Sequence, residues 1–325
     1  MNLIVFQKTM KYVISIFATV GVLVVMIPTD TRAVDTAFQK RFDSLFIIAS
    51  SGEVQYRNMN APAMDSIAGM GIDVVPLLVD RFTTKSARER WTIIWTLQRV
   101  GAKAVPYLVE SLEKRDWVIV ERVCWALGDI KDTAAVVSLI SSTRHAHWQV
   151  RDQAYTALGK IADGRAGEAT LAGLHDSIPL VRKSATVAIG RIAPDSAIPL
   201  LIGAFADPFY GVRMTAVDAL FAYDTLLVIQ ALSDSIVSSN PLVADLVCLA
   251  LGRTKRPEVA QTLFSATASE SDHVRASAIE AIIAVDPVDQ NGYQKVFLAK
   301  ETSLLVKMRV ESAISAARGQ AESAR

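Results

Sequence analysis

The stretch Val150–Ile161, V-R-D-Q-A-Y-T-A-L-G-K-I, recurs in variant form along most of the chain. Its leucine, Leu158, marks the period, because steps of 31 residues lead to Leu127, Ile189, Leu220, Leu251 and Ile282. A step of 30 residues before Leu127 reaches Leu97, and a step of 32 after Ile282 reaches Ile314. A period of this size indicates stacked supersecondary units rather than one wound globule.

Each unit is predicted to be a pair of helices. Apolar residues of the stretch recur with the spacing of an amphipathic helix; they are Val150, Ala154, Leu158 and Ile161. Between the copies lies a second apolar segment, and short loops separate the two helices. Examples of the second segment are Ala104–Leu112, Ala134–Ile140, Ala197–Phe205 and Val259–Ala266.

Small residues also repeat in register. Alanine recurs at the position of Ala154, where we expect helix axes to approach closely, and glycine follows the marker in several copies. A glycine inside a helix costs roughly 1 kcal/mol relative to alanine, so its repetition indicates either tight packing between helices or an early helix end. The residues are Ala154, Ala185, Ala216 and Ala278, and Gly128, Gly159, Gly190 and Gly252.

The repeated pattern, V-R-x-x-A-x-x-A-L-G-x-I, resembles the HEAT repeat in its short bacterial form, which is named after phycobilisome lyases. The match is closest in Val150–Ile161 and Val181–Ile192 and covers the chain from about Ala61 to Arg318. The resemblance implies an all-α fold, an α-solenoid that binds other molecules along its concave face, and it implies little about chemistry. We therefore expect about eight to nine stacked antiparallel helix pairs, preceded by a signal peptide.

Composition limits the kinds of partner. The chain has 325 residues, of which 51% are hydrophobic, so it can bury a substantial core. Its formal net charge is only +1, which does not suggest a nucleic-acid footprint. A protein or a small ligand is the expected kind of partner, and the oligomeric state is not predicted.

Residues 1–33 have the layout of a secretory signal peptide. Lys8 and Lys11 precede the uncharged run Val13–Ile27, and a cleavage site is predicted after Ala33. The alternative is a retained membrane anchor, which usually needs about 20 apolar residues. Both interpretations predict export, with a periplasmic location favoured and a membrane-anchored one as the alternative.

The rest of the chain is predicted to divide into capping and regular parts. Residues 34–71 would form N-terminal capping helices, residues 72–287 the regular repeats, and residues 288–325 a C-terminal capping pair with a polar, frayed tail. Atypical units are expected at both ends because an open solenoid end exposes apolar surface. The predicted capping helices are Thr36–Ala49, Ala61–Met70, Tyr293–Ala299 and Leu304–Arg318.

An arginine recurs in the first turn of the second helix. The set is Arg151, Arg182, Arg213 and Arg275. A cation there is unfavourable against the helix dipole, so an acidic partner is expected. We predict a structural ladder between repeats, with loop acids as partners; the alternative is that some of the arginines bind an anionic ligand. The proposed partners are Asp132, Asp163, Asp195 and Asp224.

Aromatic residues gather in neighbouring repeats. Trp95 and Trp125 occupy the same register and should lie close together, Trp91 precedes Trp95 by one turn, and Tyr155 is one position out of register in the next repeat. Tryptophan and tyrosine are enriched in binding hot spots, and large rings also fill gaps between helices. A partner-binding patch is the hypothesis, and packing between repeats is its alternative.

The two cysteines are not predicted to pair. Cys124 and Cys248 lie four repeats apart in the same register. Stacked helices at 8–10 Å spacing place them roughly 35–40 Å from each other, whereas a disulfide needs Cα atoms within about 7 Å. We expect both to be small buried apolar residues.

No metal, cofactor or catalytic site is predicted. His145 and His147 lack the spacing of a helical zinc motif and have no further Cys or His nearby, so a solvated loop is expected. The chain has no Gly-rich phosphate loop, no G-x-S-x-G and no C-x-x-C.

Three functional hypotheses remain. The first is an exported, non-enzymatic scaffold that binds a protein along the concave face. The second is an enzyme or ligand carrier similar to the phycobilin lyases, which would use the aromatic residues to stack a flat ligand. The third is a structural element tethered to the membrane by a retained N-terminal segment.

Overall fold

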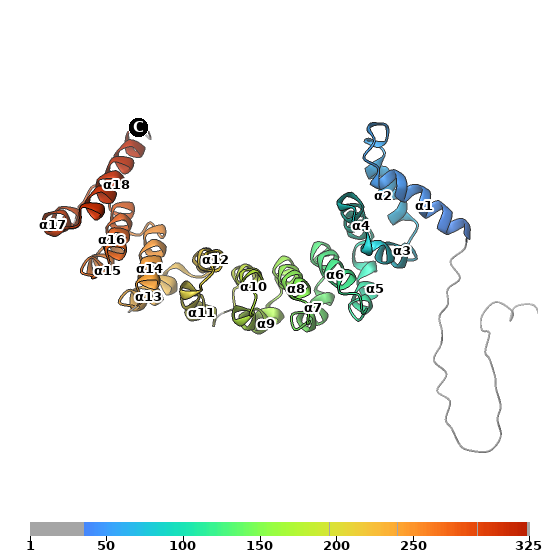
Figure 1. Cartoon of the computed structure of the whole chain (residues 1–325), viewed down its shortest axis with the longest axis horizontal. Helices are drawn as coiled ribbons and strands as arrows, with labels where there is room; N and C mark the ends of the chain where they lie inside the picture. The colour runs from blue at the N-terminus through green and yellow to red at the C-terminus, as the bar shows by residue number, and fades with distance from the viewer. Residues whose placement is uncertain (1–35, 195, 239, 291, 324–325) are drawn as a thin grey trace, which may run out of the picture. The chain divides into compact units, whose positions relative to one another are not determined.

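A computed structural model of the chain describes residues 36–194, 196–238, 240–290 and 292–323 (Figure 1). The predicted signal peptide, residues 1–33, lies outside the described residues. Among the described residues, the repeats belong to one compact unit, Arg41–Arg325, and Thr36–Lys40 belong to a separate unit.

The described residues form α-helices and short 3-10 turns, arranged as the helix pairs that the 31-residue period predicts. The first helices of the pairs are α1 (Thr36–Ser50), α3 (Val74–Asp80), α5 (Val105–Ser111), α7 (Val136–Ser142), α9 (Gly167–Ala172), α11 (Ala197–Gly203), α13 (Thr225–Ser235), α15 (Ala260–Ala266) and α17 (Tyr293–Lys300). The second helices are α2 (Asn60–Gly69), α4 (Ala87–Val100), α6 (Trp117–Ile130), α8 (Trp148–Ile161), α10 (Pro179–Ile192), α12 (Tyr210–Leu220), α14 (Pro241–Arg253), α16 (Asp272–Val285) and α18 (Leu304–Ser323). The last helix thus extends beyond Arg318, where the sequence pattern had placed its end. No helix in these ranges is long and apolar enough to cross a membrane.

The even-numbered helices pack side by side, α6 on α8, α8 on α10 and α14 on α16 among them (Figure 1). Their marker residues from Leu97 to Ile282 are fully buried, as Leu127 and Leu158 illustrate, and Ile314 is partly buried. The repeated glycines account for the close approach. A Cβ atom on Gly128 would lie 2.8 Å from the Cα atom of Ala157, and α6 continues past Gly128 to Ile130. Tight packing, rather than an early helix end, therefore explains this glycine register.

Three consecutive even-numbered helices end in a left-handed residue that is not glycine. The C-caps of α6, α8 and α10 are Lys131, Ala162 and Ala193, with φ of 60°, 57° and 50°. Their backbone N–H groups donate to the carbonyl oxygens of the marker residues, Leu127, Leu158 and Ile189. Lys255, at the same register position four residues after Leu251, is also left-handed, with φ of 56°. The left-handed conformation costs an L-residue roughly 1–2 kcal/mol, so these helices end at a measurable cost.

One junction departs from the pattern. Helix α12 ends at Leu220, and Phe221 occupies the register position that holds glycine in α6, α8, α10 and α14. Within the described ranges, α12 and α14 are the one pair of neighbouring even-numbered helices from α2 to α18 that do not pack closely. Contacts of α11 with α13 and α14 join the two repeats instead. The apolar core nevertheless continues across the junction, since Leu220 and Leu251 belong to one buried cluster.

Candidate functional site

Three tryptophans form a cluster on α4 and α6. The ring of Trp91 lies 4.6 Å from that of Trp125 in an edge-to-face arrangement and 5.4 Å from that of Trp95. Trp91 is therefore the centre of the cluster, although the register argument had placed Trp95 directly beside Trp125. Trp91 and Trp95 are each 43% exposed, and Trp125 is half-buried. The cluster presents apolar surface to solvent while its rings stabilise one another.

Hydrogen bonds hold the Trp125 ring and the backbone of Trp95. The indole Nε1 of Trp125 donates to Asp129 at 2.9 Å, and Lys160 on α8 donates to the other oxygen of that carboxylate at 2.7 Å. On α4, Arg99 donates to the carbonyl oxygen of Trp95 at 3.0 Å and forms an ion pair with Asp65. A hydrogen bond thus orients the Trp125 ring, whereas the rings of Trp91 and Trp95 are positioned by packing.

Tyr155 does not join the tryptophan cluster, contrary to the prediction. It is only 4% exposed and packs with Val181 and Ala185, and its hydroxyl donates to the carbonyl oxygen of Ala169 at 3.3 Å. One position along a helix turns the side chain by about 100°, which moves it from the solvent-exposed face into the interface between helices. Burial raises the pKa of the Tyr155 phenol. The aromatic patch consists of Trp91, Trp95 and Trp125 alone.

The repeated arginines join adjacent repeats. Arg151 donates through Nε and Nη2 to the two carboxylate oxygens of Asp176 at 2.6 and 2.9 Å. Arg182 binds Asp207 in the same way, at 2.6 and 2.8 Å. In each case the acid stands 25 residues after the arginine, in the loop that precedes the next even-numbered helix. We call these contacts the arginine ladder.

The carboxylates of the ladder are held ionised. Burial alone raises the pKa of Asp207, but hydrogen bonds from Arg182 and from the Phe209 N–H outweigh it, and the pKa lies below its usual value. The same balance lowers the pKa of Asp176. Arg275 binds Glu301 through two nitrogens, and the hydrogen bond from Arg275 holds the pKa of Glu301 at about 2.

The partner acids of the ladder differ from those predicted. Asp132, Asp163 and Asp224 instead accept hydrogen bonds from backbone N–H groups at the start of the odd-numbered segments, and Asp195 lies outside the described residues. Because paired helices run antiparallel, the start of an odd-numbered helix lies at the opposite edge from the start of an even-numbered one. The signal for the true partners was present, since Asp176 and Asp207 are 31 residues apart like the arginines.

Arg213 forms an incomplete rung of the ladder. Its Nη1 donates to the carbonyl oxygens of Asp207 and Pro208 at 2.8 and 3.2 Å, and its guanidinium lies over the ring of Tyr210. The residue 25 positions later is Ser238, which offers no carboxylate. The incomplete rung coincides with the open junction between α12 and α14.

A second set of contacts between repeats was missed by sequence reasoning. It lies on the solvent-exposed face of the even-numbered helices, where an acid on one helix pairs with a cation or hydroxyl on the next. The register of the marker could have revealed it, because most of these residues stand two positions before or after a marker. The pairs are Asp129 with Lys160, Asp152 with Ser184, Asp218 with Arg253, and Glu280 with Arg309.

The cysteines are buried in the repeats, and two histidines lie together in the loop before α8. Cys124 and Cys248 are both free and buried, as predicted, and burial raises the pKa of each thiol to about 12. The ring of His147 stacks on Trp117 at 5.0 Å, and His145 accepts from the His147 backbone N–H. Among the described residues, no group of three or more His, Cys, Asp or Glu side chains is arranged to hold a metal ion.

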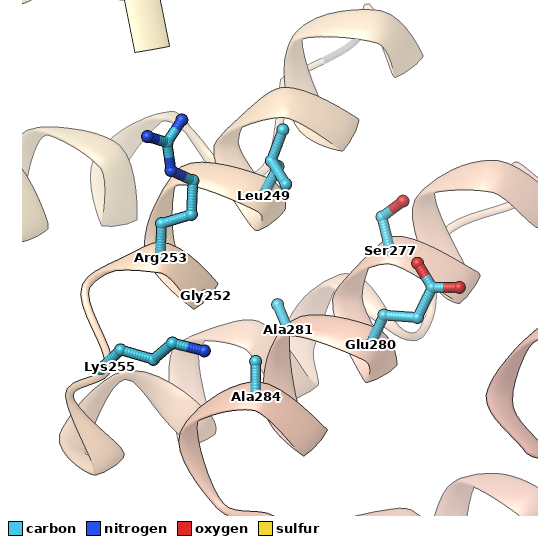
Figure 2. Close-up of a pocket in the computed structure, with 8 residues that line it drawn as sticks. All are labelled: Leu249, Gly252, Arg253, Lys255, Ser277, Glu280, Ala281 and Ala284. Carbon is cyan, nitrogen blue, oxygen red and sulfur yellow. The ribbon is translucent and has the colours of Figure 1, made fainter. Parts of the chain in front are cut away.

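A shallow cavity of about 170 Å³ lies between α14 and α16. Figure 2 shows Arg253 and Lys255 at the end of α14 on one side and Ser277 and Glu280 of α16 on the other. Arg253 and Glu280 are already engaged in the ion pairs between repeats. The cavity lies beside Gly252, where a Cβ atom would lie 2.8 Å from the Cβ atom of Ala281 on α16.

Several solved structures are similar to the chain. The Escherichia coli protein YibA is 18% identical with a TM-score of 0.48, and the match covers 82% of this chain and 98% of that one. The CpcE–CpcF complex of phycocyanin lyase from Nostoc sp. is 16% identical with a TM-score of 0.40, covering 75% and 94%. Human deoxyhypusine hydroxylase is 18% identical with a TM-score of 0.33, covering 76% and 96%. No curated protein matches the sequence.

HEAT repeats are matched at residues 75–159, 105–177 and 167–240. Together these matches span residues 75–240, which is more than half of the 325-residue chain. They include the arginine rungs at Arg151 and Arg182 and the glycine register of α6, α8 and α10. The chain belongs to the HEAT-repeat family.

Proposed function

We propose that the protein is an exported, non-enzymatic scaffold that binds a protein partner on the solvent-exposed face of its even-numbered helices, the Val150–Ile161 series that we expect to line the concave side of the solenoid. The tryptophan cluster is the anchor of this surface. The observation that supports the proposal most strongly is the exposure of Trp91 and Trp95, each 43%, within a cluster whose rings are held in place. Rigid, exposed aromatic groups are typical of interface hot spots, because little conformational entropy is lost when they are covered.

A non-enzymatic role is supported by the way in which reactive groups are engaged. Carboxylates on the solvent-exposed face, such as Asp129 and Glu280, are bound by cations of the neighbouring helix. The thiols of Cys124 and Cys248 are buried, and with a pKa of about 12 each is protonated at neutral pH. These groups stabilise the stack of repeats.

Export is proposed from residues 1–33. Lys8 and Lys11, the apolar run Val13–Ile27 and the small residue Ala33 have the order of a cleaved signal peptide. Fractionation of the native cells should place the protein in the periplasm, and its mature N-terminus should be Val34. Recovery in the cytoplasm with Met1 retained would refute export, and recovery in the membrane with Met1 retained would identify an anchored protein.

Photo-crosslinking in native cells tests partner binding. A photoreactive amino acid at position 91 or 95 should capture a defined protein, whereas the same group at the exposed position of Val137 on α7 should not. Trp95→Ala should weaken capture by at least about tenfold, as expected of a hot-spot residue. Its melting temperature should fall much less than that of Tyr155→Ala, because Trp95 is 43% exposed and Tyr155 only 4%. Tyr155→Ala is the opposite control, and it should lower the melting temperature.

The same protein preparations distinguish the scaffold from a ligand carrier. A flat ligand stacked on Trp91 and Trp95 would give the purified protein a visible or near-ultraviolet absorption band that Trp95→Ala removes. A band of this kind, without protein capture at either position, would replace the scaffold proposal with the carrier.

A further inference from the structure

The solvent-exposed face of α4, α6, α8 and α10 is rich in cations. On each helix it comprises five residues, which lie nine, six, five and two positions before the marker and two positions after it. Every one of these residues except Thr92 is at least partly exposed. We call it the α4–α10 face; its four helices lie side by side in Figure 1. Six cations stand on it against three carboxylates. The cations are Arg88, Arg99, Arg122, Lys160, Lys183 and Arg191, and the carboxylates are Glu121, Asp129 and Asp152.

The carboxylates of the α4–α10 face are already bound. Asp129 accepts from Lys160 and Trp125, and Asp152 accepts from Ser184 at 2.6 Å. Glu121 lies 3.8 Å from Arg122 and is half-buried, and burial raises its pKa. An incoming ligand therefore meets little free negative charge on this face.

Two cations at the ends of the face remain available. Arg88, at the start of α4, donates to the carbonyl oxygen of Ser51, and Arg191 lies exposed in the last turn of α10. Within the described part of the chain, no carboxylate forms an ion pair with either of them. The tryptophan cluster lies on α4 and α6, so Arg88 stands on the same stripe of α4 as Trp91 and Trp95.

The cation excess is confined to this half of the repeats. The equivalent positions on α12, α14, α16 and α18 carry Arg253 and Arg309 against Asp218, Asp245 and Glu280. The net charge of +1 for the whole chain hides this difference. A partner selected by charge would consequently settle on α4–α10 and not on the later repeats.

We infer that the α4–α10 face binds an acidic segment of a protein, with one apolar side chain of that segment seated on the tryptophan cluster. The inference rests on the proposed function and specifies the chemistry of the partner. Exposed cations steer an acidic partner and select it against basic ones, while aromatic burial supplies most of the affinity. Four helices at 8–10 Å spacing extend over roughly 24–30 Å, which an extended segment of roughly eight or nine residues spans.

A synthetic peptide of that length, glutamate throughout except for one central phenylalanine, is the direct probe. Titration followed by tryptophan fluorescence should show saturable binding and a blue shift as Trp91 and Trp95 are covered. Affinity should fall by at least about tenfold in about 1 M salt, where the Debye length is about 3 Å. The matching lysine peptide should not bind, and replacing the phenylalanine by alanine should weaken binding by about tenfold.

Charge reversal on the protein locates the contact. The double variant Arg88→Glu, Arg191→Glu should weaken the glutamate peptide by about tenfold or more at low salt. Lys103→Glu, an exposed charge reversal at the start of the α5 segment, should leave the affinity unchanged. Circular dichroism melts should be alike for all three proteins, which separates a lost contact from lost folding.

The two proposals fail in different ways. If photo-crosslinking at position 95 captures a protein in wild-type cells and in the Arg88→Glu, Arg191→Glu variant alike, the scaffold stands and the acidic-segment inference is wrong. Equal affinity for the glutamate and lysine peptides would also overturn the inference, as would single-stranded DNA that binds as tightly as the glutamate peptide. If no protein is captured at either tryptophan position, the proposed function itself is wrong.

Discussion

The junction between α8 and α10 and the junction between α12 and α14 occupy equivalent places in the repeat but are built differently. At the first, α10 approaches so closely that a Cβ atom added to Gly159 would lie 3.0 Å from the Cα atom of Ala188. Arg151 of α8 also binds Asp176, in the loop that precedes α10. At the second, Phe221 replaces the glycine, and Arg213 has no carboxylate 25 residues later. Arg253 bridges the wider junction by pairing with Asp218 and covering the Phe221 ring at 4.8 Å.

At the α12–α14 junction, the close packing and the carboxylate partner of the ladder arginine are both missing. The two features do not depend on each other, because Arg275 binds Glu301 although Ile283 stands at the register position of the glycine. In a linear repeat array, stability is the sum of terms within repeats and between nearest neighbours. The α12–α14 junction is therefore the weakest coupling in the stack, although the buried core runs through it.

The largest effect is expected from placing the same side chain at the two equivalent positions. Gly159→Val should destabilise the protein by about 3 kcal/mol, because the new atoms meet the backbone of α10 rather than a flexible side chain. Phe221→Val should cost about 1 kcal/mol or less, since Phe221 is 42% exposed. Urea unfolding provides both free energies. Equal losses at the two positions would show that the α12–α14 junction is as tightly packed as its neighbour.

A smaller contrast is expected from removing single arginines. Arg182→Met should cost about 2 kcal/mol, because it removes two charge-assisted hydrogen bonds and leaves the largely buried carboxylate of Asp207 without them. Arg213→Met should cost less than about 1 kcal/mol because only backbone carbonyl contacts are lost. Thermal melts of the two variants make the comparison, and a greater loss at Arg213 would contradict it.

Low pH should weaken the ladder contacts that include a carboxylate, such as Arg275 with Glu301, and should not affect the contacts of Arg213. The pKa of Glu301 is about 2 in the folded chain against an ordinary value of 4.5, so its contribution to stability is present above about pH 4.5 and is lost as the pH falls towards 2. Arg275→Met should flatten this acid limb in unfolding free energies measured from pH 5 downward. Arg213→Met should leave the limb as steep as in the wild type. A steep limb in the Arg275 variant would mean that other carboxylates cause the loss.

The smallest expected effect is a gain. Ser238 already accepts from the backbone N–H two residues later, as Asp176 and Asp207 do in their turns. Ser238→Asp should therefore keep the turn, complete the rung to Arg213 and stabilise the protein by about 0.5–1 kcal/mol. The gain should vanish in the Arg213→Met background, which a double-mutant cycle measures. A gain that persists without Arg213 would point to the turn rather than the ladder.

The repeat period predicted most of the fold because it depends on residues that face the same neighbour in every copy. Leu158 and its equivalents from Leu97 to Ile282 are buried, and the register argument separated Cys124 from Cys248 correctly. The candidate site was harder to predict, because a surface residue has no periodic constraint. Tyr155 was placed with the tryptophans because it lies close to their register in the sequence. It stands one position out of that register, so its side chain points in a different direction around the helix and is buried. The ladder acids were misassigned because a single sequence does not show which edge of the stack each loop occupies.

The left-handed caps at Lys131, Ala162 and Ala193 are positions at which a single substitution can increase the stability of the protein. Each of these residues adopts a backbone conformation that glycine adopts without penalty. Replacement by glycine at any one of them relieves strain without touching the tryptophan cluster or the ladder. Mutational drift on the partner-binding surface can thus be offset by substitutions at helix ends, so a new binding specificity can evolve in this chain without a loss of folding.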